Sequence, residues 1–168
     1  MATLVEIYRM HARGEYELAI IEAEERLKGM TCSRDGSMWV ELNCIVGDAL
    51  LDLKRFEEAE ARFDLVWTQC RDPVALANRG FAKWKQGAYE AAFKDVMAAV
   101  KTNEGSDIEV GLRNAMGIAM DMNRPDIVSP LSKEYHRRFG RTNKMRQLLK
   151  DFSSRYPEFA LDPDQEDE

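Results

Sequence analysis

Residues 80–92 read GFAKWKQGAYEAA, and this stretch decides how the chain folds. Within it, a turn residue (Gly87), an aromatic residue (Tyr89) and a small residue (Ala92) stand at fixed offsets. The same register occurs twice more, at Gly14-x-Tyr16-x-x-Ala19 and at Lys54-x-Phe56-x-x-Ala59. A register that recurs along a chain indicates repeated units of structure, each of which buries its apolar face against its neighbours.

Small residues mark the places where the two helices of one unit cross. Gly47 and Gly80 each stand 12 residues before an alanine, Ala59 and Ala92, and the two glycines are 33 residues apart. A small residue on each helix lets the backbones approach closely, and a larger one would push them apart. At the turn, a glycine such as Gly87 adopts a conformation that strains other residues. The pattern therefore predicts helix hairpins that pack side by side, without strands.

This register resembles that of the tetratricopeptide repeat, whose unit is about 34 residues long. The unit that begins at Asp72-Pro73 matches best, because these residues supply an N-cap and a first-turn proline. Its other matching positions are Gly80, Gly87, Tyr89, Ala92 and Ala99. The resemblance implies an all-α, right-handed superhelical solenoid of antiparallel helix pairs over residues 1–156. A C-terminal helix from Arg141 to Arg155 would cap its open end.

Other units depart from the family pattern. Ala19 and Ala59 are 40 residues apart, so we expect the loop from Thr31 to Ser37 to hold an insertion. A degenerate fourth unit is suggested over residues 105–140 by Gly117, which lies 37 residues after Gly80. There, residues 123–126 replace the usual turn.

Composition limits the classes of protein that remain. The chain has 168 residues, of which 45% are hydrophobic and five are proline, enough to bury a core as one elongated domain. Apolar runs are short and interrupted by charge, and the N-terminus carries Glu6 and Arg9, so neither a membrane span nor a signal peptide is expected. Cys32, Cys44 and Cys70 form no CxxC pair. They favour a reducing, cytoplasmic setting over a disulfide scaffold or a zinc site.

Catalytic chemistry finds little support in the sequence. The two histidines, His11 and His136, are separated by most of the chain, and no phosphate-binding glycine motif is present. We therefore expect no catalytic residue, no metal and no cofactor. Cys44 has no histidine or basic residue in its helical turn, which favours an inert thiol over a nucleophile.

Charge is distributed unevenly along the chain. Residues 131–156 carry eight Lys or Arg and two acids, whereas residues 157–168 carry six acids and no base, which predicts an acidic, disordered tail. The basic residues of the first segment could form a patch for an acidic partner or nucleic acid: Lys133, Arg137, Arg138, Arg141, Lys144, Arg146 and Lys150. A solvated helix face screened by the tail is the favoured alternative, because aromatic residues for base stacking are few there.

The resemblance implies a concave groove lined by the first helices of successive units. The family positions carried onto this chain are Tyr8 and His11; Glu41, Cys44, Asp48, Leu51 and Asp52; Val74, Ala77, Phe81, Trp84 and Lys85; and Asn114, Ile118, Asp121 and Met122. Two aromatic residues beside several carboxylates predict a ligand with an apolar anchor and basic flanks. The alternative for Trp84 is packing beneath the next unit or the C-terminal helix.

We therefore expect a non-enzymatic protein-interaction module, an adaptor, scaffold or chaperone-like protein that holds a partner segment in its groove. The paired lysines and asparagines with which related domains grip acidic chaperone tails are absent, because those places hold Leu4, Tyr8, Asp48 and Val74. Two alternatives stay open. One is a self-associating or complex-stabilising subunit, and the other is a nucleic-acid-associated regulator that uses residues 133–155.

Overall fold

The computed structural model describes residues 2–102, 107–140 and 142–159, and these residues form helices and no strand. The all-α class predicted from the sequence is therefore confirmed. The helices are α1 (Leu4–Ala12), α2 (Tyr16–Leu27), α3 (Cys32–Asp52), α4 (Phe56–Cys70), α5 (Pro73–Lys85), α6 (Tyr89–Thr102), α7 (Asp107–Asp121), α8 (Pro125–Phe139) and α9 (Asn143–Arg155), followed by a 3-10 turn, Pro157–Phe159. None of the helices in the described ranges is long and apolar enough to cross a membrane.

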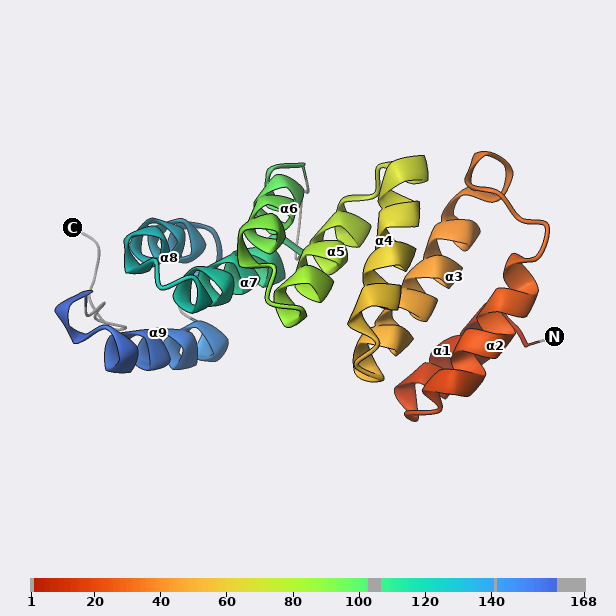
Figure 1. Ribbon diagram of the computed structural model, residues 1–168, viewed down its shortest axis with the longest axis horizontal. Coiled ribbons are helices and arrows are strands. Elements are labelled where there is room, and N and C mark those ends of the chain that lie inside the picture. The colour runs from red at the N-terminus through yellow and green to blue at the C-terminus, as the bar shows by residue number, and fades with distance from the viewer. Residues whose placement is uncertain (1, 103–106, 141, 160–168) are drawn as a thin grey trace.

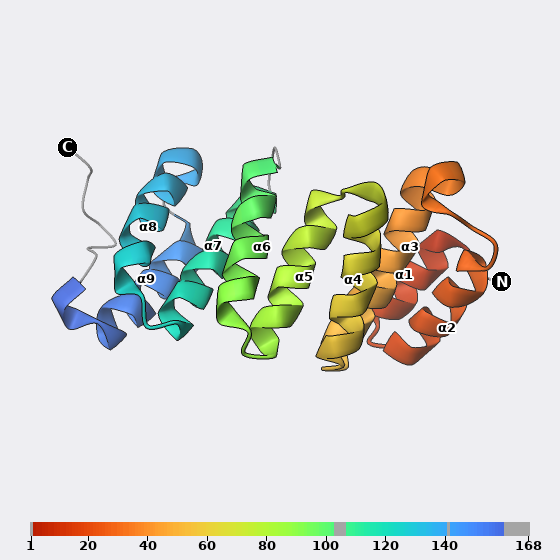
Figure 2. The ribbon, with the colours of Figure 1, turned by 45° about the horizontal axis from the view of Figure 1, so that its top comes forward.

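The helices form an elongated row, with α1 and α2 at one end and α8 and α9 at the other (Figures 1 and 2). From α1 to α8, each helix packs against the next one in the chain. Further contacts join α1 to α3, α5 to α7 and α7 to α9. Odd-numbered helices therefore lie against one another as well as against their own partners.

The four turns within helix pairs share one backbone geometry. Each has a residue with positive φ: Gly14 at 79°, Lys54 at 60°, Gly87 at 81° and Asn123 at 56°. In every turn this residue and the next donate backbone hydrogen bonds to the last turn of the preceding helix. The fourth pair, α7 and α8, thus uses the same turn as the others, because asparagine tolerates the left-handed region better than most residues do.

Glycines permit close helix crossings within the second and third pairs, as the sequence predicts. A Cβ atom on Gly47 would lie 2.5 Å from Cζ of Phe63 in α4, and one on Gly80 would lie 3.0 Å from the carbonyl oxygen of Ala92 in α6. Gly117 differs, because a Cβ there would lie 2.6 Å from Cη2 of Trp84. In the fourth pair the glycine therefore makes room for the preceding pair and not for its own second helix.

The prediction that residues Thr31 to Ser37 form a loop with an insertion is wrong in detail. Residues 32–35 form a helical turn that begins α3, and Gly36, with φ of 48° and ψ of −122°, interrupts the helix before it continues. The extra residues are therefore accommodated by a short turn and a kink. Glycine is required at this kink because other residues rarely adopt such a backbone conformation.

The expectation that the cysteines form no disulfide is also wrong. Cys32 at the start of α3 and Cys70 at the end of α4 are joined by a disulfide, with their Cα atoms 6.4 Å apart. The two residues are 38 positions apart in the sequence, and only the antiparallel packing of α3 on α4 brings them together. Cys44 remains a free thiol.

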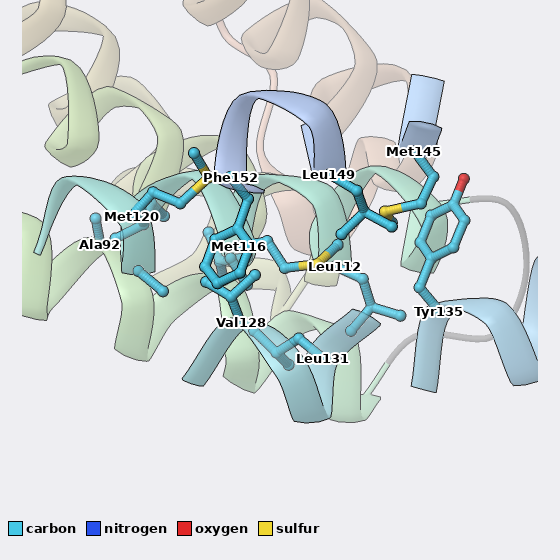
Figure 3. Packing of buried hydrophobic residues seen from close by; sticks show 14 of the residues in the cluster. Ala92, Leu112, Met116, Met120, Val128, Leu131, Tyr135, Met145, Leu149 and Phe152 are labelled. Carbon is cyan, nitrogen blue, oxygen red and sulfur yellow. The ribbon is translucent and has the colours of Figure 1, made fainter. Parts of the chain in front are cut away.

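The predicted C-terminal helix is present as α9, which packs against α7 near the C-terminal end of the row; it begins at Asn143, and Arg141 lies outside the described residues. In Figure 3, apolar side chains of α7, α8 and α9 converge, including Leu112 and Met116, Val128 and Leu131, and Leu149 and Phe152. Tyr156 adds a hydrogen bond of 2.8 Å from its hydroxyl to the carbonyl oxygen of Met120. Of the predicted acidic tail, residues 157–159 form the 3-10 turn and residues 160–168 lie outside the described residues.

A charged network joins α5 to α6 in the middle of the row. Asp95 is only 7% exposed and accepts hydrogen bonds of 2.7 and 2.8 Å from Arg79 and of 2.8 Å from Lys83. Burial by itself would raise the pKa of Asp95, but these two cations outweigh it and hold the pKa below its ordinary value. The carboxylate is thus a fixed part of the interface between the two helices.

Candidate functional site

The predicted groove residues of α1 and α3 do come together. Four carboxyl groups, which we call the acidic cluster, are those of Glu41, Asp48, Asp52 and Asp72. Three of them are close enough to the Cys44 thiol to raise its pKa, and the fourth, Asp52, acts on Asp48. The cluster is built by α3 together with Asp72, the N-cap of α5, whose side chain accepts a hydrogen bond of 2.8 Å from the backbone of Ala75.

Asp48 is the central member of the cluster. Burial raises its pKa to about 6; the next effect, that of His11, lowers the pKa, and the smallest, the charge of Asp52, raises it. The side-chain amide nitrogen of Asn78 in α5 donates a hydrogen bond of 3.3 Å to a carboxyl oxygen of Asp48. A raised pKa means that the charged form is poorly compensated, so a cation beside Asp48 would relieve it.

His11 and Tyr8 stand on α1 beside the cluster. Nε2 of His11 lies 3.1 Å from a carboxyl oxygen of Asp52, a distance suited to an ion pair but without the direction of a hydrogen bond. The Tyr8 side chain is 46% exposed. Burial of its hydroxyl and the charges of Glu41 and Asp48 raise its pKa. Tyr8 therefore offers solvent an aromatic ring next to an acidic surface.

Cys44 lies among the acidic cluster without being reactive. Burial, with smaller effects from Asp48, Asp72 and Glu41, raises the pKa of its thiol to about 12. The thiolate is the nucleophilic form of cysteine, and at neutral pH this side chain is a thiol. The structure therefore agrees with the inert thiol favoured by the sequence.

A second group of predicted residues is built on α5. The rings of Phe81 and Trp84 meet edge to face with centroids 5.8 Å apart, and Nζ of Lys85 lies 4.9 and 5.0 Å from them. Trp84 also donates a hydrogen bond of 2.8 Å from its indole nitrogen to Asp121 of α7. Its ring fills the space beside Gly117. Trp84 thus joins two helix pairs, which is the alternative that the sequence left open.

The predicted lining from α7 needs correction. Ile118 is fully buried and belongs to the core, so it cannot contact a ligand. Asp121 is exposed, but its two carboxyl oxygens contact Trp84 and Arg155. Asn114 and Met122 are half-buried. Position within a repeat predicts which face a residue occupies, but α9 lies against α7 and changes what is exposed there.

Three site features were missed by sequence reasoning. The sequence does not predict Asn78, one helical turn after Val74, as a groove residue, because it does not occupy one of the family's lining positions. Asp72 was read only as an N-cap. The third is a groove of about 620 Å³ between α2 and α4, lined by charged residues and by apolar ones that include the exposed Ile21 and Leu65. An ion pair of 2.5 Å between Arg62 and Glu24 joins its two walls.

The predicted basic patch is spread over α8 and α9. Lys133, Arg137 and Arg138 are exposed on α8, and Lys144, Arg146 and Lys150 are exposed on α9; Arg141 lies outside the described residues. Arg137 and Arg138 both bind Glu134 and lower the pKa of that carboxyl to about 2. Part of the positive charge is therefore already neutralised within α8.

Comparison with known proteins found no family model that matches the chain and no curated protein that matches it. Among the described residues, no three or more His, Cys, Asp or Glu side chains are placed so that they could hold a metal ion together, and this includes the acidic cluster.

Proposed function

We propose that this protein is a non-enzymatic interaction module whose helix row is a tetratricopeptide-like, right-handed solenoid. It holds an extended segment of a partner protein along the faces of α1, α3 and α5. The common turn geometry of the four helix pairs and the close crossings at Gly47 and Gly80 support the architecture. The partner segment places a lysine or arginine at the acidic cluster and an apolar side chain near Phe81.

The half-buried carboxyl of Asp48 carries this proposal. A folded-state pKa of about 6, above the ordinary 3.8, means that ionisation of Asp48 opposes folding. The contribution of this group to stability is present at low pH and is lost as the pH rises from 3.8 to about 6. Ionisable groups whose charge destabilises the folded protein are found more often at binding sites than elsewhere. A cationic side chain of a partner would compensate the charge and so gain affinity.

The test begins with an array of short synthetic peptides that vary in charge and aromatic content, probed with the full chain. Peptides that combine a basic and an apolar residue should be retained. For a retained peptide, Asp48→Asn should weaken binding by about 2 kcal/mol or more, because it leaves a buried cation without its partner. Wild-type affinity should increase as the pH is raised through 6, as Asp48 ionises.

The matched control is Glu90→Gln, which removes an exposed carboxylate from α6. It should leave peptide affinity and its pH dependence as in the wild type. Asp48→Asn should also raise the stability of the free protein at pH 7. Retained peptides without lysine or arginine, or equal binding by the Asp48 and Glu90 variants, would rule the proposal out.

Self-association is a second candidate, supported by exposed apolar side chains on α2. Ile21 is 61% exposed and Leu18 is 44% exposed at the N-terminal end of the row, where a polar cap would be expected. If this surface pairs two copies, light scattering should give a dimer mass that Ile21→Glu returns to that of a monomer. A monomeric wild type at every concentration tested would exclude this function.

A further inference from the structure

We propose that Cys32 and Cys70 form a reversible thiol–disulfide switch that controls the segment between α2 and α3. This inference concerns a different part of the molecule from the acidic cluster, and it holds or fails independently of the proposed function. The bond joins the first residue of α3 to the last residue of α4. The turn between these helices, at Lys54, lies at their opposite ends, so the disulfide closes the open end of the hairpin.

Few other contacts hold the segment that the disulfide fixes. Asp35 accepts a hydrogen bond of 2.6 Å from the backbone of Thr31, and Arg34 donates one to the carbonyl of Gly29. Both contacts are local to the segment and do not attach it to α4. Gly36 separates the turn of residues 32–35 from the continuous part of α3. Residues 31, 33, 34, 36 and 37 are exposed, so besides the cross-link the turn is attached by the packing of Cys32 and the neighbouring Met30 against the core.

The positions of the cysteines suit reversible chemistry. Both residues are half-buried, so neither is enclosed in the core. The third cysteine does not compete, because burial raises the pKa of the Cys44 thiol to about 12 and leaves it a poor nucleophile. Oxidation therefore gives a single pairing. Disulfides that do form in a reducing compartment are usually transient and serve catalysis or redox sensing.

Reduction requires two thiol groups as co-reactant, supplied by one dithiol or by two molecules of a monothiol such as glutathione. With a dithiol it proceeds in two exchanges. One thiolate of the dithiol attacks Sγ of one cysteine, the S–S bond breaks, and its electron pair passes to Sγ of the other, which takes up a proton. The second thiolate of the dithiol then displaces the first cysteine from the mixed disulfide. The protein gains two electrons and two protons, and the dithiol becomes a disulfide. A disulfide oxidant reverses the exchange.

The consequence of reduction is local release. Without the bond, the turn of residues 32–35 keeps its own short-range hydrogen bonds and the packing of Cys32 and Met30 on the core, and the α2–α3 connection opens more readily than the rest of the row. The hairpin also loses the loop-closure constraint on its unfolded state. For a bond spanning 38 positions, the chain-entropy model gives a rise in the unfolding equilibrium constant of ~10²- to 10³-fold.

The experiment uses the full chain in glutathione buffers of graded redox potential. Free thiols are blocked by alkylation, and intact mass gives the oxidised fraction. We expect a single two-electron transition that Cys44→Ser leaves unchanged. Hydrogen exchange followed by mass spectrometry should show faster exchange in residues 29–37 after reduction, with a larger increase there than in peptides from α6 to α9. Denaturant titration of the two forms measures the change in the unfolding constant.

The Cys32→Ser, Cys70→Ser double variant is the matched control and should show the exchange pattern of the reduced form in both buffers. If that variant does not fold, the wild type compared in oxidising and reducing buffers still tests the proposal. The switch would be refuted if no disulfide forms, if Cys44 takes part in the bond, or if residues 29–37 exchange equally fast in both forms.

Discussion

Replacement of Gly47 by alanine tests how closely α3 and α4 approach. Two opposing effects decide the outcome. Alanine is favoured over glycine inside a helix by about 1 kcal/mol. The new Cβ, however, would lie 2.5 and 2.6 Å from Cζ and Cε1 of Phe63, whose side chain is fully buried. Overpacking of this kind costs about 1–3 kcal/mol.

The clash outweighs the gain in helix propensity because a buried ring has no free space into which it can move. Gly47→Ala should therefore lower the free energy of unfolding by about 1 kcal/mol, seen as a lower urea midpoint with an unchanged m-value. Shortening the opposing side chain with Phe63→Leu should remove the clash. In that background Gly47→Ala should be neutral or stabilising, and the double-mutant cycle measures the difference.

Gly111→Ala is the matched control, because its Cβ would meet one side-chain methyl group of Val100, which is only half-buried and has room to adjust. Its cost should be smaller than that of Gly47→Ala. A Gly47→Ala protein that is more stable than the wild type would mean that α3 and α4 are further apart than described, and the reasoning would be refuted.

Four other perturbations have defined outcomes. Ala92→Leu should destabilise the protein by about 1–3 kcal/mol through overpacking at the second crossing, which thermal melting would detect. Asp95→Asn should lower stability at pH 7 and reduce the loss that the wild type shows below about pH 4, since a depressed pKa stabilises only where the carboxyl is ionised. Trp84→Ala should cost about 3 kcal/mol of stability, whereas Phe81→Ala should mainly weaken peptide binding; equal melting temperatures for the two would contradict this division. Removal of residues 158–168 should create a salt-sensitive affinity for polyanions if the tail screens the basic patch, measured by fluorescence anisotropy with single-stranded DNA.

Much of the site was visible in the sequence because helical periodicity places residues on faces. Tyr8, Glu41 and Asp48 were assigned to one surface from their positions within repeats, and the structure does bring them together. The sequence did not show how the surroundings change the pKa values of these groups. The raised pKa of Asp48 depends on burial and on the position of Asp52, and both are properties of packed helices.

The sequence by itself determined the helical class, the first three turns and the crossings at Gly47 and Gly80, whereas it wrongly predicted a different turn for the fourth pair. Each of these depends on interactions between residues close in the chain, such as the backbone conformation at Gly87 or the spacing of Gly80 and Ala92. Local sequence carries that information because a helix pair is a local unit, and its pattern repeats.

Only the tertiary structure decided which distant residues meet. Cys32 and Cys70 pair because antiparallel packing returns the end of α4 to the start of α3, a geometry that no cysteine spacing encodes. Likewise, Ile118 and Trp84 are covered by elements that pack from outside their own helix pair. Burial depends on what a side chain contacts across the whole row, so a repeat pattern predicts the face of a residue without predicting whether another element covers it.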